Sequence, residues 1–149
     1  MRKSKIIFSI LISCLFLVSC RGTSEVANVY ASPILKAEVN RFRVLITTNQ
    51  AELTGIMIIK HMEGEWRGSL INEFGMKAFD FTVNNNKCRI KNAVSFMDKW
   101  HIRKTIESDL ALLFNNRQKK GKLLEMSENE IILTNEKRGI KYNFYSIEN

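Results

Sequence analysis

After residue 37, hydrophobic and polar residues follow mainly a period of two. In the segment 37–48, the apolar residues Phe42 and Val44 alternate with arginines, and β-branched residues are frequent. This pattern is typical of a β-strand with one face turned toward a core. The segment 52–60 is instead apolar at every position from Ile56 to Ile59. It predicts a central strand that is covered on both faces of the sheet.

Six further segments show alternation or an enrichment in β-branched and aromatic residues. Polar or glycine-containing stretches at 61–64, 84–86, 128–129 and 136–139 predict the loops and turns around them. The segments predicted to form these strands are 65–74, 76–83, 87–94, 122–127, 130–135 and 140–147.

One segment follows a helical period instead. Its apolar residues recur at spacings of three and four, Asp98 precedes them as a candidate N-cap, and Asn115-Asn116 follows them as the end of the helix. The apolar residues of this predicted helix are Ile102, Ile106, Leu110, Leu113 and Phe114. Several strands, then one helix, then three strands predict an α+β fold, with an antiparallel sheet covered by one main helix.

The stretch "INEFGMKAFDF", residues 71–81, interrupts the alternation. Large residues occupy even positions up to Phe74 and odd positions from Phe79 onward. A two-residue period shifts in this way at an extra residue, so Gly75 is predicted to mark a β-bulge or a tight turn. In both cases the chain bends there, and we expect aromatic residues from both sides of the bend to face one interior.

No set of residues in the sequence indicates catalysis. Glu73 and Asp80 flank the bend, but their parity directs both away from the aromatic face, toward solvent or a basic neighbour. His61, predicted in a loop, and His101, predicted at the helix start, lack the spacing of a metal site. Cys88 is interpreted as a small strand residue in preference to a nucleophile. We therefore expect no enzymatic activity, no metal and no cofactor.

The first nineteen residues have the organisation of a bacterial export signal. Basic residues at positions 2, 3 and 5 precede an uncharged apolar run from Ile6 to Val18. As a helix this run spans roughly 20 Å, which is short of the roughly 30 Å hydrocarbon core of a bilayer. It ends in Leu17-Val18-Ser19-Cys20, which resembles a lipobox, with cleavage before Cys20 and a diacylglycerol on its thiol. The alternative is an ordinary signal peptide with an incidental cysteine.

The N-terminal prediction divides the chain into three parts. Residues 1–19 form the lipoprotein signal peptide, 20–36 a flexible tether, and 37–149 a single domain. Because Cys14 is lost with the leader and Cys20 is acylated, no internal disulfide is expected. The predicted location is the cell envelope, with the acyl chains in the outer membrane on its periplasmic face in preference to the inner membrane.

Positive charge is concentrated in one segment. The formal net charge is +8, and it falls to +5 when the three basic residues of the leader are removed. Residues 99–122 carry the whole of this excess. An exported protein is not expected to bind nucleic acid, so a basic patch here indicates anionic head groups or an acidic protein; the alternative is a solvated surface. The candidate patch residues are Arg117, Lys119, Lys120 and Lys122.

The strand "LTGIMIIK", the hairpin with "GSLINEFGMKAFDF" and the helix ending in "LALLF" together resemble the LolA/LolB-like superfamily of bacterial lipoproteins. These are outer-membrane lipoprotein carriers and receptors, together with many uncharacterised lipoproteins. The family pairs a glycine-containing strand with one that ends in a bulky residue and a glycine, matched here by Gly55 and by Phe74-Gly75-Met76. The resemblance covers residues 38–114. It implies a half-open antiparallel β-barrel with a helical lid over an apolar cavity and, in the LolB branch, a lipidated N-terminus.

Two functions remain open from the sequence. The first is a membrane-anchored, monomeric lipoprotein that binds a lipid or acyl chain in an apolar cavity and aids lipid or lipoprotein handling; the alternative to a cavity is a packed core. The second is a non-enzymatic envelope module that docks a protein or anionic head groups through the basic segment 99–122. The candidate cavity residues are Ile56, Ile58, Trp66, Leu70, Phe74, Phe79, Phe81, Ile102, Ile106 and Leu110.

Overall fold

The computed structural model describes residues 35, 37–115 and 119–147 of the 149-residue chain. Within these residues the chain forms eight strands and one helix. The helix, α2, spans Trp100–Asn115. The strands are β1 (Val39–Thr47), β2 (Glu52–Met62), β3 (Glu65–Asn72), β4 (Lys77–Asn84), β5 (Lys87–Lys91), β6 (Lys122–Met126), β7 (Glu130–Asn135) and β8 (Ile140–Ser146).

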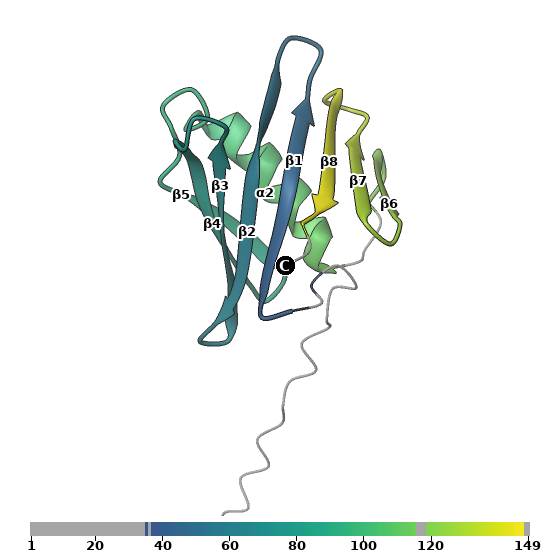
Figure 1. Ribbon diagram of the computed structural model, residues 1–149. Helices are drawn as coiled ribbons and strands as arrows, with labels where there is room; N and C mark the ends of the chain where they lie inside the picture. Colours follow the sequence, from purple (N-terminus) through teal and green to yellow (C-terminus); the bar gives the residue numbers. More distant parts are fainter. Residues whose placement is uncertain (1–34, 36, 116–118, 148–149) are drawn as a thin grey trace, which may run out of the picture.

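The strands form one antiparallel sheet in the order β5-β4-β3-β2-β1-β8-β7-β6. Its two edges, β5 and β6, do not pair with each other, so the sheet curls into a half-barrel and does not close. In Figure 1 the helix α2 lies behind the sheet, across the hollow of this half-barrel. The predicted fold class is confirmed: a curved antiparallel sheet covered by one helix.

The two strands β2 and β3 form a longer hairpin than the sequence predicts. His61 and Met62, predicted in a loop, continue β2 and pair with Trp66 and Glu65 of β3. The imidazole of His61 lies against the Trp66 indole, with 4.7 Å between ring centroids. The turn is reduced to two residues, 63 and 64, which both have positive φ (53° and 79°). Such a turn matches the twist of a hairpin and leaves the ladder intact up to it.

The predicted bend at Gly75 is a tight turn between β3 and β4. Gly75 has a φ of +76°, and its N–H donates to the Asn72 carbonyl (3.0 Å). The Asn72 side chain accepts hydrogen bonds from the N–H groups of Phe74 (3.0 Å) and Met76 (2.9 Å). Phe74 therefore lies in the turn and is 85% exposed. The prediction that it faces the interior was wrong, because the strand period ends at Asn72.

The shift in alternation comes from a β-bulge beside this turn. Leu70 pairs with Phe79, but the next residue, Ile71, pairs with Lys77. Ala78 is thus an extra residue in β4, and both Ala78 and Phe79 are buried. The bulge allows the large residues of β3 at even positions and those of β4 at odd positions to share the concave face.

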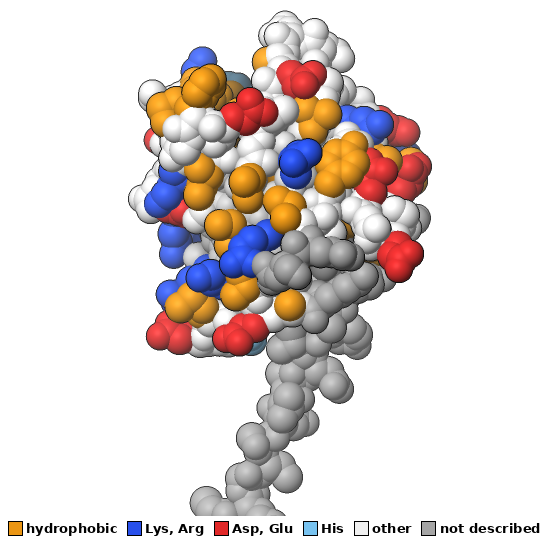
Figure 2. Space-filling view, viewed as in Figure 1, with side chains coloured by type: hydrophobic (Ala, Val, Ile, Leu, Met, Phe, Trp, Pro, Cys, Tyr) orange, Lys and Arg blue, Asp and Glu red, His pale blue; other side chains and the backbone are white. Residues whose placement is uncertain are grey.

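The core lies between the concave face of the sheet and α2. On β2, Met57 and Ile59 point into it and are each 1% exposed. Ile56 is 46% exposed and Ile58 is partly exposed, because both lie on the convex face. The prediction that this strand is covered on both faces was therefore wrong: in the described part of the chain, α2 covers only the concave side. Figure 2 shows the convex face, where apolar side chains lie among basic ones.

The helix α2 begins slightly later than predicted. The first helical backbone bond runs from the N–H of Arg103 to the carbonyl of Lys99 (3.0 Å), so Lys99 occupies the N-cap position. The carboxylate of Asp98, the predicted cap, accepts a hydrogen bond from the Arg103 guanidinium instead (2.9 Å). The C-terminal half of the helix is the more deeply buried, from Asp109 to Phe114. Before Asp109, Ile106 is the one buried residue of the helix.

Leu35 also belongs to the folded domain, although it lies within the predicted tether. It is 8% exposed and packs with the core residues. The predicted signal peptide and Cys20 lie outside the described residues. No helix among the residues that the structure describes is long and apolar enough to cross a membrane.

Candidate apolar pocket

A pocket of about 540 Å³ opens between the N-terminal half of α2 and the sheet. Its walls come from four places in the sequence: the end of β1 with the β1–β2 turn, the residues before α2, the helix itself, and the β7–β8 turn with the start of β8. These turns lie at one end of the half-barrel, because β1 and β7 run toward it and β2 and β8 run away from it (Figure 1). The pocket is therefore the open end of the space between sheet and helix.

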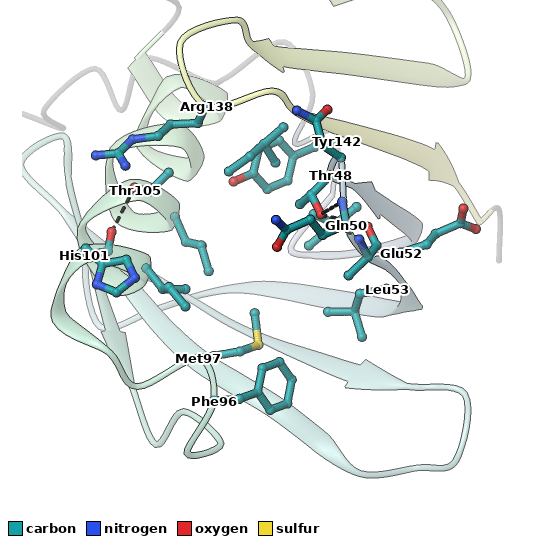
Figure 3. A pocket seen from close by; sticks show the side chains of 16 residues that line it. Thr48, Gln50, Glu52, Leu53, Phe96, Met97, His101, Thr105, Arg138 and Tyr142 are labelled. Carbon is teal, nitrogen blue, oxygen red and sulfur yellow. Dashed lines mark hydrogen bonds between the residues drawn. The ribbon is translucent and has the colours of Figure 1, made fainter.

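The floor of the pocket is apolar and its rim is polar. Figure 3 shows Leu53, Met97 and Tyr142 directed into the space between sheet and helix, whereas Glu52 points away from it. The remaining floor residues are aliphatic, and the rim carries amides, a histidine and an arginine. The floor comprises Ile46, Leu53, Met97, Ile102, Ile106, Ile140 and Tyr142, and the rim comprises Asn49, Gln50, Glu52, His101 and Arg138.

Local structure explains why these side chains converge. Ile46 and Leu53 are cross-strand partners on either side of the β1–β2 turn. Ile102 and Ile106 are four residues apart and so lie on one face of α2. Thr48 organises the turn between the two strands, because its hydroxyl accepts the N–H of Ala51 (2.9 Å) and donates to the Ala51 carbonyl (3.0 Å). The turn thereby forms a fixed part of the rim.

Only two of the ten predicted cavity residues line this pocket: Ile102 and Ile106. Ile56, Ile58 and Phe74 point outward, as described above. The remaining five lie in the core or pack against it beyond the pocket: Trp66, Leu70, Phe79, Phe81 and Leu110.

Those five residues do not border the pocket because they pack against one another and against the end of α2. The ring of Phe114 lies 6.2 Å from that of Trp66 and 6.3 Å from that of Phe81. Phe79 is 6.3 Å from Phe81, and the Phe81 ring occupies the space above Gly68. This region of the half-barrel is a packed core, which was the alternative to a cavity.

Most of the pocket walls could not be predicted from the sequence. Residues 49–51 lie between two predicted strands, and Met97 precedes the predicted helix. The wall made by Arg138, Ile140 and Tyr142 reaches the same site because β8 returns beside β1, which no local pattern encodes. The four-residue spacing of Ile102 and Ile106 was the available signal; both residues line the pocket, whereas Leu110, selected by the same period, does not.

A buried polar cluster lies next to the pocket floor. The carboxylate of Asp109, which is 0% exposed, accepts hydrogen bonds from the Tyr142 hydroxyl (2.8 Å) and from the Asn135 amide (2.9 and 3.0 Å). The ammonium of Lys122 forms an ion pair with it at 2.5 Å. Burial raises the pKa of Tyr142 well above its ordinary value, and the adjacent Asp109 carboxylate raises it further. The Tyr142 hydroxyl therefore remains a donor to Asp109, and the cluster links α2 to β6, β7 and β8.

This cluster corrects the predicted basic patch. Lys122 was expected at the surface, but its side chain is only 13% exposed and also donates to the Ser108 hydroxyl (2.8 Å). It is drawn inward because Asp109 needs a cation in the core. Lys119 and Lys120 are exposed as expected, and Arg117 lies outside the described residues.

The two carboxylates of the bend belong to separate hydrogen-bond groups. Glu73 accepts a hydrogen bond from the Thr54 hydroxyl, whereas Asp80 accepts them from Ser69 (2.6 Å), Lys77 (3.0 Å) and Asn92 (3.0 Å). Partial burial by itself raises the pKa of Asp80, but these three donors together lower it below the ordinary value of 3.8. The ion pair with Lys77 is the basic neighbour that the sequence predicts for Asp80.

Cys88 lies in β5 and is 6% exposed. Burial, together with the nearby Glu107 carboxylate, raises the pKa of its thiol to about 12. The thiol is therefore protonated at neutral pH, as expected of a packing residue. In the described part of the chain, no three His, Cys, Asp or Glu residues form a group that could hold a metal ion.

Comparison with models of known protein families finds no match for this chain, and comparison with curated proteins finds no similar sequence.

Proposed function

We propose that this protein is a lipid-anchored component of the bacterial cell envelope that binds an acyl chain in the pocket beside α2. The observation that carries the proposal is the pocket itself: about 540 Å³, with an apolar floor and a polar rim. Its volume lies within the range of about 300–1,000 Å³ that is usual for sites binding small molecules. A long, narrow apolar ligand with one polar end suits this distribution of side chains.

Apolar transfer supplies the driving force for such a ligand. Each methylene group moved from water to an apolar site contributes about 0.8 kcal/mol. A buried segment of about ten carbons would gain roughly 8 kcal/mol before the entropic cost of association is subtracted. The aliphatic floor leaves few polar groups to desolvate, because the Tyr142 hydroxyl is already satisfied by Asp109.

The rim offers groups for the polar end of the ligand. Arg138, from the β7–β8 turn, and His101, from α2, both line the pocket, and Figure 3 shows them on the same side of it. Arg138 is exposed and forms no ion pair with another described residue. Its guanidinium is suited to a carboxylate or a phosphate, which it can bind through two parallel hydrogen bonds.

The same end of the half-barrel presents large apolar side chains to solvent. Phe74 and Met76 in the β3–β4 turn are 85% and 60% exposed, and Phe96 and Trp100 near the start of α2 are 62% and 75% exposed. Exposed aromatic residues around a pocket mouth favour contact with a membrane surface. An acyl chain could then pass from the bilayer to the pocket without crossing water.

The LolA/LolB-like resemblance agrees with this proposal at the level of architecture. A half-barrel with a helix across its hollow is the arrangement that the resemblance implies. Acylation of Cys20 would hold the domain close to the membrane from which ligands come. We retain the family assignment, the acyl anchor and the outer-membrane location as parts of the proposal.

A filled-pocket variant tests the proposal. In the chain from Arg21 onward, Ile102→Trp places an indole in the pocket, and titration with a fluorescent C12 fatty acid measures binding. We expect the dissociation constant to rise about tenfold or more, because the indole occupies space that the acyl chain needs. Native mass spectrometry of the same protein, purified from cells, should reveal co-purified lipid in the parent and less in the variant.

The matched control is Ile58→Trp. Ile58 is also partly exposed, but it lies on the convex face, away from the pocket. It should leave fatty-acid binding unchanged. Equal binding by the parent and Ile102→Trp, or the absence of both co-purified lipid and any lipid-induced change in the melting temperature of the parent, would contradict the proposal.

A further inference from the structure

A second hollow, of about 640 Å³, lies between the edge strand β5 and the flank of α2 that faces away from the pocket. Its lining is strongly basic, with one carboxylate, Glu107, among six cationic side chains. Three of the cations belong to a strand of five residues. The basic side chains are Lys87, Arg89, Lys91, Arg103, Lys104 and Lys119.

The side chains of Glu107 and Arg103 form the floor of the hollow. The Glu107 carboxylate accepts the N–H of Ile90 (3.0 Å), and the Arg103 guanidinium donates to the Ile90 carbonyl (2.7 Å). Both backbone groups of Ile90 on the free edge of the sheet are thereby satisfied by side chains of α2. Lys104 pairs with Glu107 (3.0 Å). Among the described residues of the lining, Glu107 is the only carboxylate, and it is therefore already neutralised.

The other four cations have no such role. The side chains of Lys87, Arg89, Lys91 and Lys119 are exposed and form no hydrogen bond or ion pair with another described residue. On β5, Lys87, Arg89 and Lys91 alternate with the buried Cys88 and Ile90, so their side chains lie on the opposite face of the strand. The other wall of the hollow is formed by α2 and Lys119. The hollow thus runs along the sheet edge between two rows of positive charge.

The hollow continues toward an exposed tryptophan. A smaller depression shares Arg103, Lys104 and Glu107 with it and extends to Asp98 and Trp100 at the start of α2. The Asp98 carboxylate is paired with Arg103 (2.9 Å). Trp100 is 75% exposed. A tryptophan beside a row of lysines and arginines is typical of the interface between a membrane and water.

We propose that this hollow, defined as the β5–α2 groove, binds the phosphate groups of anionic membrane lipids. Trp100 would then enter the head-group region beside them. The site is independent of the acyl pocket, because α2 separates the two: Ile102 and Ile106 line the pocket, whereas Arg103 and Glu107 line the groove. Loss of one activity therefore does not imply loss of the other.

Basic residues on an edge strand can also serve to prevent pairing with other sheets. Charge reversal separates this role from lipid binding, because glutamate protects an edge as lysine does but repels a phosphate. The test variant is Lys87→Glu/Arg89→Glu/Lys119→Glu in the full chain. The matched control is Lys60→Glu/Lys137→Glu/Lys141→Glu, which changes the net charge equally at exposed positions outside the groove.

Binding is measured by co-flotation with vesicles of phosphatidylcholine alone and of phosphatidylcholine mixed with phosphatidylglycerol. The N-terminal segment, with its basic residues 2, 3 and 5, is the same in the parent and in both variants. A change in the preference for anionic vesicles between these proteins therefore isolates the substituted lysines and arginines. We expect the test variant to reduce this preference by about a hundredfold and the control by much less. In the parent, anionic vesicles should also shift Trp100 fluorescence to shorter wavelength, a change that Trp100→Phe removes.

Three results would overturn the proposal. Equal losses in both triple variants would mean that only net charge matters. An unchanged preference in the test variant would leave the groove cations with edge protection alone. Saturable binding of inorganic phosphate, without any preference for anionic vesicles, would assign the groove to a free anion.

Discussion

Asp109 shows most clearly how a single residue shapes this protein. It lies on the buried face of α2, 0% exposed, yet it carries a carboxylate. Burying an unpaired charge costs several kcal/mol, and the fold offsets this with three donors from separate strands: Lys122 on β6, Asn135 on β7 and Tyr142 on β8. These contacts hold α2 against β6, β7 and β8, the last three strands of the chain.

Removing one partner of this cluster should destabilise the protein more than removing two. We expect Asp109→Leu to lower the free energy of unfolding by about 3–5 kcal/mol, because Lys122 would remain buried without a counter-charge. The double variant Asp109→Leu/Lys122→Met should recover at least about 1 kcal/mol of that loss. Urea denaturation of the parent, the single variants and the double variant measures the coupling. Additive losses would contradict the account.

Cys88 provides a prediction on pH. The pKa of its thiol rises from 9.0 to about 12 on folding, chiefly through burial. A raised pKa stabilises the folded state below pH 9, and this contribution is lost as the pH rises from 9 toward 12. The parent should therefore lose more stability than Cys88→Ala over this range.

The measurement is urea denaturation of both proteins at about pH 8 and about pH 11. Tyr142, whose pKa is also raised, is present in both and cancels from the comparison. A difference in stability between parent and variant that stays constant with pH would show that the thiol ionises equally in the folded and unfolded states.

At the scale of elements, two glycines allow β2, β3 and β4 to pack closely. A Cβ on Gly55 would lie 2.3 Å from the Ile71 carbonyl oxygen, and a Cβ on Gly68 would lie 2.2 Å from the Phe81 ring. The first close approach is to backbone and the second to a side chain. Gly55, singled out in the sequence for its resemblance, therefore has a physical role in the pairing of β2 with β3.

This difference between the two glycines can be tested. Gly68→Ala should destabilise the protein by about 1–3 kcal/mol through overpacking. In the background of Phe81→Leu, which removes the ring, the same substitution should cost about 1 kcal/mol less. Gly55→Ala should gain no relief from Phe81→Leu, because its obstacle is a carbonyl group. Thermal unfolding of the parent, the three single variants and the two double variants measures these costs. A smaller cost of both glycine substitutions in the Phe81→Leu background would contradict the conclusion that Gly55 faces backbone and Gly68 faces the Phe81 ring.

Strand positions were predicted well at this scale, but the faces of β2 were not. All eight predicted strands overlap the observed ones, because alternation and turn residues are local signals. The local sequence does not determine which face of β2 meets the helix, because both faces are apolar between Ile56 and Ile59. The local period also does not locate the bulge: the extra residue is Ala78, three residues beyond Gly75, which the pattern indicates.

At the scale of the whole molecule, the helix α2 separates two hollows in the protein surface. The apolar pocket opens on one flank of α2 and the β5–α2 groove on the other. Phe96, which lines the pocket, is 62% exposed, and Trp100, at the start of α2, is 75% exposed. Under the proposed function, contact of the end that carries the pocket mouth with a membrane would place the pocket at the bilayer surface.

The anchor gives the prediction at this scale. Cys20→Ser should abolish metabolic labelling with palmitate and release the protein from the membrane fraction, because stable attachment depends on more than one acyl chain. Cys14→Ser and Cys88→Ser serve as controls and should retain the label. Labelled protein in the Cys20→Ser variant would place the modification elsewhere and contradict the lipobox.

The sequence by itself determined the strand segments, the one amphipathic helix, the bend near Gly75 and hence the α+β class, because each depends on residues within about ten positions of one another. The tertiary structure alone decided that β8 returns beside β1, that Lys122 turns inward to Asp109, and that the pocket opens beside Ile102 and not among the aromatic residues. Those features depend on contacts between segments far apart in the chain, where packing and charge pairing in three dimensions override the local period.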